Sequence, residues 1–264
     1  MIDIHHHCLP GVDDGPGELD EAVDLCAAAA EAGIETIVAT PHVLRGRWRV
    51  FSRLELQSRL DELRARVGET PRILLGCEYF FSHDMADVLR EGTSVFALAG
   101  SRYVLLELPA NSVPPMFNQP LYRAQLDGWL PILAHPERNT VFQANPEILA
   151  ALIGHGLRVQ LTATSLTGAF GSHARAAAET LLQRRLVHFV ATDAHNTSKR
   201  PPRMAEALAA LRELVGEEVA TALTVDNPRA VIENRALPYD PEPQEVDSPG
   251  LFTRLRGFFR PNQA

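Results

Sequence analysis

Residues 186–196 read LVHFVATDAHN, an apolar run that passes directly into polar residues. Within it, HFVAT is apolar at consecutive rather than alternating positions, which is typical of a parallel strand covered on both faces. Three other segments share this pattern: TIVAT (36–40), YVLLEL (103–108) and PILAH (131–135). Parallel strands need crossover connections, usually helices, so the pattern predicts an α/β protein.

Helical segments separate these strands along the chain. The expected helices are 18–33, 52–68, 117–129, 145–156, 172–185 and 201–216, with Ser52 as an N-cap, Gly33 ending the first helix, and proline at the start of the last. The expected strands are 2–5, 34–42, 72–80, 103–109, 130–138, 157–165 and 186–196. About seven strands, each followed by a helix, predict an α/β barrel that is closed or nearly so.

The composition fits an ordinary globular protein of a reducing compartment. The chain has 264 residues, 45% of them hydrophobic, which suffices for one large domain or two small ones. Its formal net charge of −8 disfavours generic binding of DNA or RNA. The three cysteines are far apart, and there is no apolar leader and no membrane-length apolar run. We therefore expect a cytoplasmic location.

Almost every expected strand ends in a side chain that can bind a metal. These side chains are His5, His7, His42, Glu78, Glu107, His135, Asp193 and His195, and Asp13 and Asp14 follow the first strand. The carboxyl ends of barrel strands converge on one face, so we expect these residues to meet. One such residue alone is more often a surface residue, but eight in equivalent places favour a site. Imidazole with carboxylate suits zinc, iron or manganese.

The three histidines at residues 5–7 are not expected to point in the same direction, because side chains alternate along a strand. Side chains two apart share a face, so His5 and His7 are expected to point together, and Asp193 with His195 likewise. His6 is expected to point away and to be dispensable for the site. The remaining histidines, His83, His155, His173 and His188, do not fit the pattern and are interpreted as structural or solvated.

A cysteine-based phosphatase mechanism is not supported by the spacing. That mechanism needs an arginine six positions after the nucleophilic cysteine. Asp14 follows Cys8 at this distance, Ala32 follows Cys26, and His83 follows Cys77. We interpret the three cysteines as small core residues.

Seven segments occur in order along the chain: DIHHHCLPGVDDGP, ATPH, GCEYF, LLELP, LAHPER, VATDAHN and KRPPRM. Over about residues 1–235 they resemble the polymerase-and-histidinol-phosphatase (PHP) superfamily. More closely, they resemble its bacterial tyrosine-protein phosphatases encoded with capsule and exopolysaccharide genes. The resemblance implies a distorted (β/α)7 barrel, three divalent metal ions (manganese first, with iron, zinc or magnesium as alternatives), and hydrolysis of phosphotyrosine on a partner tyrosine kinase.

The resemblance also implies roles for individual residues. His5, His7, Glu78 and Asp193 would bind a first metal. Glu78 would bridge to a second metal held by Glu107 and His135, and Asp14, His42 and His195 would hold a third. Arg138 and Arg200 would grip the phosphate. His6 departs from the family, which usually has a small residue at that position.

Three rival functions stay open at this point. The first is a small-molecule phosphatase of the same superfamily, acting for example on histidinol phosphate. The second is a metal-dependent nuclease, which the net charge of −8 disfavours. The third is a module that binds phosphorylated peptides without turnover, which the full set of metal-capable residues disfavours.

The composition of the chain changes after residue 236. Residues 1–236 are expected to form the barrel, and the Pro-rich, acidic residues 237–250 a linker. Residues 251–264 carry apolar and basic side chains at near-helical spacing. They are expected either to contact an anionic membrane or a partner, or to fray as a short terminus.

Overall fold

A computed structural model describes residues 1–43, 51–91 and 97–244. The strands of this part are β1 (Ile2–His6), β2 (Thr36–Ala39), β3 (His42–Val43), β4 (Arg72–Leu75), β5 (Glu78–Phe80), β6 (Tyr103–Glu107), β7 (Leu130–Ala134), β8 (Arg158–Thr162) and β9 (Phe189–Ala191). Every pairing between these strands is parallel. The expected α/β class with parallel strands is confirmed.

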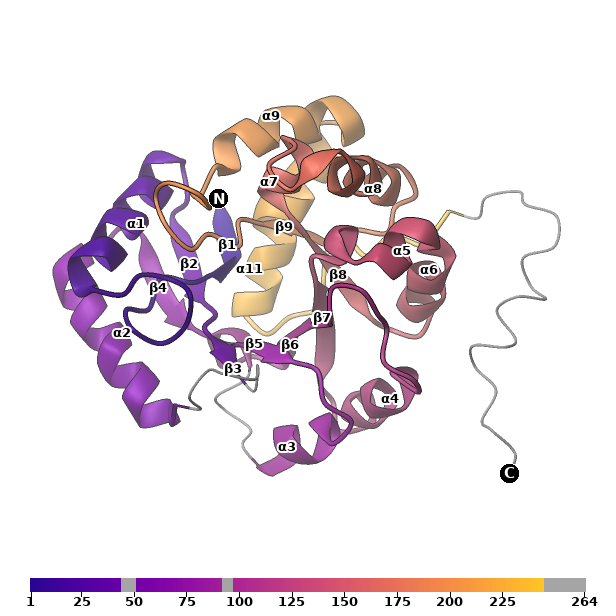
Figure 1. Ribbon diagram of the computed structural model, residues 1–264, viewed down its shortest axis with the longest axis horizontal. Coiled ribbons are helices and arrows are strands. Elements are labelled where there is room, and N and C mark those ends of the chain that lie inside the picture. The colour runs from indigo at the N-terminus through magenta and orange to yellow at the C-terminus, as the bar shows by residue number, and fades with distance from the viewer. Residues whose placement is uncertain (44–50, 92–96, 245–264) are drawn as a thin grey trace, which may run out of the picture.

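Helices connect the strands and lie around them (Figure 1). They are α1 (Leu19–Glu31), α2 (Arg53–Val67), α3 (Met85–Glu91), η1 (Leu98–Gly100), α4 (Asn118–Leu126), η2 (Pro136–Arg138), α5 (Thr140–Ala144), α6 (Pro146–Gly154), α7 (Ala163–Leu166), α8 (Gly171–Gln183), α9 (Met204–Val215), α10 (Glu217–Thr221), η3 (Ala222–Asp226) and α11 (Asn227–Ile232). The six expected helices are present. Several short helices and the helical segment 217–232 were not expected.

Two of the expected strands are each broken in two. The segment 34–42 forms β2 and β3, and the segment 72–80 forms β4 and β5. Pro41 interrupts the first because proline has no N–H for the ladder. Gly76 interrupts the second at a close approach, where an added Cβ would lie 2.8 Å from Leu98 and 2.9 Å from Val38. The strand orders are therefore β1-β2-β4 in one sheet and β3-β5-β6-β7-β8-β9 in the other.

The first and last strands lie side by side at their carboxyl ends. His6 and Ala194 form an isolated parallel bridge. The backbone N–H of Asp193 donates to the carbonyl of His5 at 2.8 Å, and that of His7 donates to the carbonyl of Ala194 at 2.9 Å. The histidine run at the start of the chain is thereby joined to the segment that follows β9.

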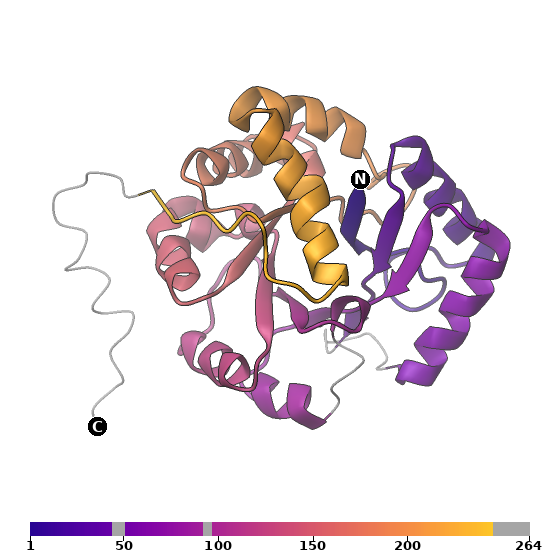
Figure 2. The ribbon, with the colours of Figure 1, turned by 180° about the vertical axis from the view of Figure 1, so that it is seen from behind.

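The strands are buried on two faces by two hydrophobic clusters. The larger cluster joins alternate strand residues to the helices around them. The smaller contains Ile4, Leu105, Ile132 and Phe189, with Val231 of α11. Figure 2 shows α11 crossing in front of the strands on this side. Burial on both faces is the reason that the strand sequences are continuously apolar.

Local signals set the helix boundaries. Ser52 is the N-cap of α2, as expected: its side chain accepts from the N–H of Glu55, whose own side chain accepts from the N–H of Ser52. The last expected helix begins later than predicted, at Met204 and not at Pro201. The carbonyls of Pro201 and Pro202 accept from Arg203 and Met204 in a turn before the helix.

The described residues end inside the predicted linker. Its first part contacts the domain: the side chain of Asn227 donates to the carbonyl of Tyr239 at 2.6 Å, and Arg158 pairs with Asp240 at 2.5 Å. The rest of the linker and the expected tail 251–264 lie outside the described residues. Among the described helices, none has the length and apolar character needed to cross a membrane.

Candidate metal centre

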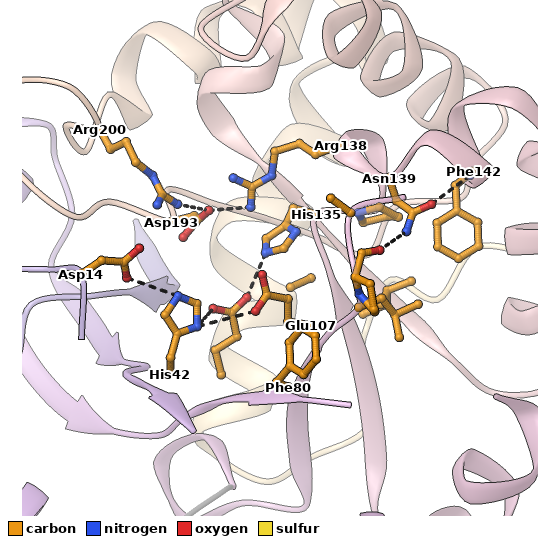
Figure 3. Close-up of a pocket in the computed structure, with 17 residues that line it drawn as sticks. Asp14, His42, Phe80, Glu107, His135, Arg138, Asn139, Phe142, Asp193 and Arg200 are labelled. Carbon is orange, nitrogen blue, oxygen red and sulfur yellow. Dashed lines mark hydrogen bonds and ion pairs between the residues drawn. The ribbon is translucent and has the colours of Figure 1, made fainter. Parts of the chain in front are cut away.

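The structure brings all of the predicted metal-binding residues to the carboxyl ends of the strands. They form four overlapping groups of donor atoms: His7, Asp14, His42 and His195; His5, Glu78 and His135; His5, His7 and Asp193; and His42, Glu78 and Glu107. Figure 3 shows several of them around one pocket. They come from loops and strand ends spread from residue 5 to residue 195, and the parallel topology gathers them.

The first group expected from the resemblance is compact. The Nε2 atom of His5 lies 3.2 Å from Nε2 of His7, 3.4 Å from Glu78 Oε2 and 3.3 Å from Asp193 Oδ1. The Nε2 atom of His7 lies 3.4 Å from each of these two carboxylate oxygens. Two imidazole nitrogens and two carboxylate oxygens therefore converge on one point. The expectation that His5 and His7 point together agrees with this geometry.

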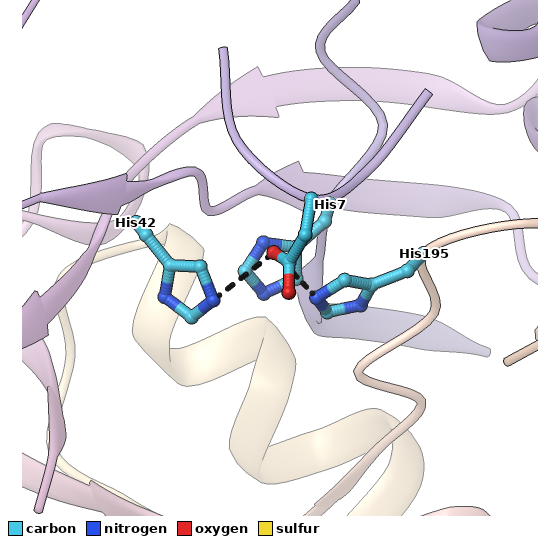
Figure 4. Close-up of side chains that lie close together, drawn as sticks. His7, His42 and His195 are labelled. Atoms are coloured by element: carbon cyan, nitrogen blue, oxygen red, sulfur yellow. Dashed lines mark ion pairs between the residues drawn. The ribbon is translucent and has the colours of Figure 1, made fainter. Parts of the chain in front are cut away.

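A second group forms around Asp14. Its Oδ1 atom lies 3.3 Å from Nε2 of His42 and 3.2 Å from Nε2 of His195. Figure 4 shows the imidazoles of His42 and His195 with His7 between them, and these four residues form one group of donor atoms. This is the third set expected from the resemblance, with His7 added.

Glu78 connects the groups. Its Oε1 atom lies 2.9 Å from Nε2 of His135, and its Oε2 atom lies 2.8 Å from Nδ1 of His42. Glu107 lies on the His42 side, with Oε2 3.7 Å from the same nitrogen. Glu107 and Glu78 group with His42, while His135 groups with Glu78 and His5, so Glu78 is common to both groups.

Hydrogen bonds orient the histidine rings. Nδ1 of His5 lies 2.8 Å from the side-chain oxygen of Gln160, Nδ1 of His7 lies 2.7 Å from Asp13, and Nδ1 of His195 lies 3.0 Å from the carbonyl of Asp193. Each partner is an oxygen that can only accept, so each Nδ1 carries the proton and donates. In the neutral form of each ring the lone pair is then on Nε2, the atom that faces the cluster.

His6 has a different environment from its two neighbours. Its ring is fully buried and belongs to none of the donor groups found among the described residues. Burial, followed by the charge of His7, lowers its pKa to about 3, so the ring is neutral. Its backbone N–H donates to the hydroxyl of Thr40 at 2.9 Å. The expectation that His6 points away from the cluster agrees with this placement.

Two arginines meet on one carboxylate oxygen at the mouth of the site. The Nη2 atoms of Arg138 and Arg200 each donate to Oδ2 of Asp193 at 2.6 Å (Figure 3). The guanidinium of Arg138 also lies over the ring of Phe170, 4.5 Å from its centroid. Both arginines remain partly exposed, so their other N–H groups can reach a bound anion.

The backbone at the site is strained at two of its residues. His135 has φ of 38° and Asp193 has φ of 53°, in the left-handed region that non-glycine residues rarely adopt. Each such residue costs roughly 1 kcal/mol or more, and the surrounding structure must hold it there. His135 follows directly on β7 and Asp193 lies two residues after β9, and both contribute donor atoms to the cluster.

The protein's own charges leave the cluster rich in anions. Burial raises the pKa of Asp193, but Arg138 and His5 outweigh burial and hold it well below its usual range. Burial lowers the pKa of His42, but the charge of Glu78 outweighs it and raises that pKa to about 9. Burial, followed by the charge of Arg138, lowers the pKa of His135 to about 3. Ionised carboxylates therefore lie beside a protonated His42 and a neutral His135.

The residues present fit divalent metal ions. The buried carboxylates of Glu78 and Glu107 bring their oxygens within 4.8 Å of each other, and they repel one another unless cations lie between them. The Nε2 lone pairs of His5, His7 and His195 face the cluster because their Nδ1 atoms are held by acceptors. Oxygen and imidazole donors without thiolate suit manganese, iron, zinc or magnesium.

A pocket of about 250 Å³ opens beside the donor atoms. Asp14, His42 and Glu107 line one side, and Arg138 and Arg200 line the other. Its remaining wall is apolar and includes Phe80, Leu108 and Phe142. The pocket can accept an anionic group against the donors and a flat apolar group against the wall.

Two supporting residues were not assigned from the sequence. Asp13 was weighed as an alternative ligand to Asp14, but its carboxylate accepts from His7 Nδ1, from the N–H of His42 at 3.0 Å and from the N–H of Gly15 at 2.9 Å. Gln160 was missed. The sequence did contain a signal for Gln160, because it is a single amide side chain between the buried Val159 and Leu161 of β8.

Comparison with known proteins identifies relatives of this chain. The family model for capsular polysaccharide synthesis, CpsB/CapC, matches residues 1–233. The tyrosine-protein phosphatase YwqE of Bacillus subtilis is 36% identical over 262 residues, covering 98% of this chain and 100% of YwqE. The tyrosine-protein phosphatase CpsB of Streptococcus pneumoniae is 32% identical over 239 residues, covering 88% of this chain and 98% of CpsB.

A solved structure agrees as well. It comes from crystallography of YwqE from Bacillus subtilis and CpsB from Streptococcus pneumoniae, described as unique metal-dependent tyrosine phosphatases. It superposes with a TM-score of 0.86 at 33% identity and covers 93% of this chain and 100% of its own. This chain therefore belongs to the capsular polysaccharide synthesis CpsB/CapC family.

Proposed function

We propose that this protein is a metal-dependent phosphatase that hydrolyses phosphotyrosine in a protein substrate, a bacterial tyrosine kinase. The observation that carries the proposal is the pair Arg138 and Arg200, held by Asp193 at the mouth of a buried cluster of histidines and carboxylates. The relatives YwqE and CpsB are named as tyrosine-protein phosphatases. The three free, buried cysteines agree with a cytoplasmic location.

The proposal assigns three divalent metal ions to the cluster, with manganese as the first candidate. His5, His7, Glu78 and Asp193 would hold one ion; Glu78, Glu107 and His135 a second; and Asp14, His42 and His195 a third. Such ions lower the pKa of bound water and supply a hydroxide nucleophile near neutral pH. The strands that carry these residues would form a distorted barrel of seven strands, each broken pair counting as one.

The chain's own residues bind and orient the phosphate. The Nη2 atoms of Arg138 and Arg200 both donate to Oδ2 of Asp193, which holds the two guanidinium groups close together, and their other N–H groups would donate to a phosphoryl group bound beside them. The two guanidinium groups would offset the charge that develops on the phosphoryl oxygens. Stacking on Phe170 restricts the guanidinium of Arg138 and thereby prepares it for this role.

The wall of the pocket favours an aryl ester. Phe80 and Phe142 present rings beside the donor cluster, and such apolar surface suits the phenyl ring of tyrosine phosphate. Phenolate is also a good leaving group, so proton donation to it is less demanding than for an alkyl ester. These features favour phosphotyrosine over histidinol phosphate.

The test is a substrate panel with metal-loaded protein. We expect turnover of a phosphotyrosine peptide to exceed turnover of histidinol phosphate and of a nucleic-acid substrate, and a chelator to abolish it. Replacing Cys8, Cys26 and Cys77 by alanine should leave the reaction largely intact. None of these cysteines has an arginine six positions later, as a cysteine-based phosphatase requires.

Two results would contradict the proposal. Chelator-resistant turnover by metal-free protein would remove the metal mechanism. Binding of the peptide without release of phosphate by the metal-loaded protein would favour the non-catalytic module. A preference for histidinol phosphate or for nucleic acid would select one of the other rivals.

A further inference from the structure

A second pocket lies beside the metal centre and carries positive charge that the proposed reaction does not use. It has a volume of about 270 Å³, and Lys199, Arg200 and Arg203 line it together with Thr164, Phe170 and Ser198. It lies where α7, α8 and the start of α9 come together (Figure 1).

Two residues belong to both pockets or connect them. Arg200 lines the second pocket and also the pocket at the metal centre. Phe170 lines the second pocket, and its ring lies 4.5 Å beneath the guanidinium of Arg138, which lines the first. A molecule whose phosphate is held by Arg138 and Arg200 can therefore continue over Phe170 into the second pocket.

The positive charges of the second pocket are weakly compensated. Within residues 1–43, 51–91 and 97–244, no carboxylate lies within 4.0 Å of the ammonium of Lys199. Arg203 has a loose, exposed ion pair with Glu206 at 3.7 Å. Exposed pairs of this kind contribute little, so Arg203 remains available to another anion.

The loop that carries Lys199 is already organised. The side-chain oxygen of Asn196 accepts from the N–H groups of Ser198 at 3.2 Å, Lys199 at 2.7 Å and Arg200 at 3.1 Å. The N–H of His195 donates to the carbonyl of Arg200 at 3.0 Å, which ties the loop to the metal centre. Binding there would not have to order the backbone first.

We propose that this second pocket selects phosphotyrosine substrates that carry another negatively charged side chain within about two residues of the phosphotyrosine. The inference rests on the proposed function and adds a substrate class to it. An extended peptide advances roughly 3.3 Å per residue, so a neighbouring side chain can reach a pocket that shares Arg200 with the first. Lys199 and Arg203 would bind the second anion, whether carboxylate or phosphate.

The experiment compares kcat/KM for four matched phosphotyrosine peptides. They differ only at one position next to the phosphotyrosine, which carries Glu, phosphoserine, Gln or Lys. We expect the wild-type enzyme to prefer the Glu peptide over the Gln peptide by about fivefold, the phosphoserine peptide by more, and the Lys peptide least. The preference should shrink as ionic strength rises.

The double variant Lys199→Gln with Arg203→Gln tests the residues. The quantity measured is the ratio of kcat/KM for the Glu and Gln peptides within each protein, so changes in overall activity cancel. We expect this ratio to fall to about one in the double variant. Arg72→Gln is the matched control, because Arg72 is exposed at the amino end of β4, away from the site, and it should keep the wild-type ratio.

The outcomes separate this inference from the proposed function. A wild-type enzyme that hydrolyses all four peptides with equal kcat/KM overturns the inference and leaves the proposed function standing. A double variant that keeps the wild-type ratio also overturns it. Failure to hydrolyse any phosphotyrosine peptide removes both. If only the phosphoserine peptide is preferred over the Gln peptide, the second pocket binds phosphate. If the Glu peptide is preferred as well, the second pocket binds anions in general.

Discussion

The two ends of the same strands differ in almost every physical property. At the carboxyl ends, His5, Glu78 and Asp193 bring charge and unusual backbone geometry into a buried space. Deeper in the strands, Ile4, Leu105 and Phe189 pack in an apolar cluster, with Val231 of α11 against them. Burial of the apolar cluster stabilises the fold. Holding ionised groups close together at the carboxyl ends of the strands lowers that stability.

Substitutions at the two ends should therefore affect different properties of the protein. Changes at the carboxyl end should alter metal content and activity more than folding. Changes in the apolar cluster should alter the free energy of unfolding and leave the activity of each folded molecule unchanged.

The largest effect is expected at His7. Replacing His7 by alanine removes an imidazole that lies within 3.4 Å of Glu78 and Asp193. Loss of a residue that orients a metal ligand typically lowers metal affinity or activity by about 10–100-fold, so loss of His7, a proposed metal ligand, should lower kcat by roughly a thousandfold. Metal analysis and phosphopeptide kinetics would measure both effects.

His6→Ser is the matched control, in the same run of sequence. Its ring is buried but lies outside the donor groups, so we expect a lower melting temperature with nearly normal metal content and kcat. Loss of bound metal in His6→Ser, with normal metal in His7→Ala, would reverse the assignment of the run.

The next effect is expected at Arg138. Arg138→Lys keeps the charge but loses the planar group that donates to Asp193 and stacks on Phe170. We expect kcat/KM for phosphotyrosine peptide to fall by about a hundredfold, which corresponds to roughly 2.7 kcal/mol of transition-state stabilisation. Steady-state kinetics would measure it. Full activity of the lysine variant would show that charge alone suffices.

A smaller effect is expected at the apolar end. Val231→Ala in α11 removes two methyl groups from a fully buried position, and we expect a loss of about 2 kcal/mol in the free energy of unfolding. Denaturant unfolding would measure it. Leu54→Ala is the control, because Leu54 is 81% exposed on α2 and should be nearly neutral. A loss of activity in folded Val231→Ala would contradict the division between the two ends.

The smallest effect is expected from His188, a buried histidine directly before β9. Its Nδ1 accepts from the N–H of Val159 at 3.2 Å, and burial lowers its pKa below 6.5. Below pH 6.5 the unfolded chain therefore binds a proton that the folded chain does not, so stability falls as pH falls. His188→Gln should reduce this loss of stability at low pH. Unfolding measured at several pH values would check it, and an unchanged slope would contradict the neutral histidine.

Much of the site was predictable because it follows the ends of strands. His5, His42, His135 and Asp193 each stand at or just after a strand end, and parallel strands bring those ends together. The grouping of Glu107 with His42 was not predictable, because it depends on side-chain directions. The breaks at Pro41 and Gly76 were also missed, since each half-strand retains an apolar pattern.

The sequence by itself determined the class of the fold and the chemical types of the donors, because apolar periodicity and residue identity are local properties. Only the tertiary structure showed that Asp13 orients His7, whereas the resemblance had already assigned its neighbour Asp14 with His42 and His195. The tertiary structure also decided that Arg200 is shared between two pockets. Both findings depend on the distance and direction between segments that are far apart in the sequence. Packing of the whole chain sets these distances and directions, and the local sequence does not.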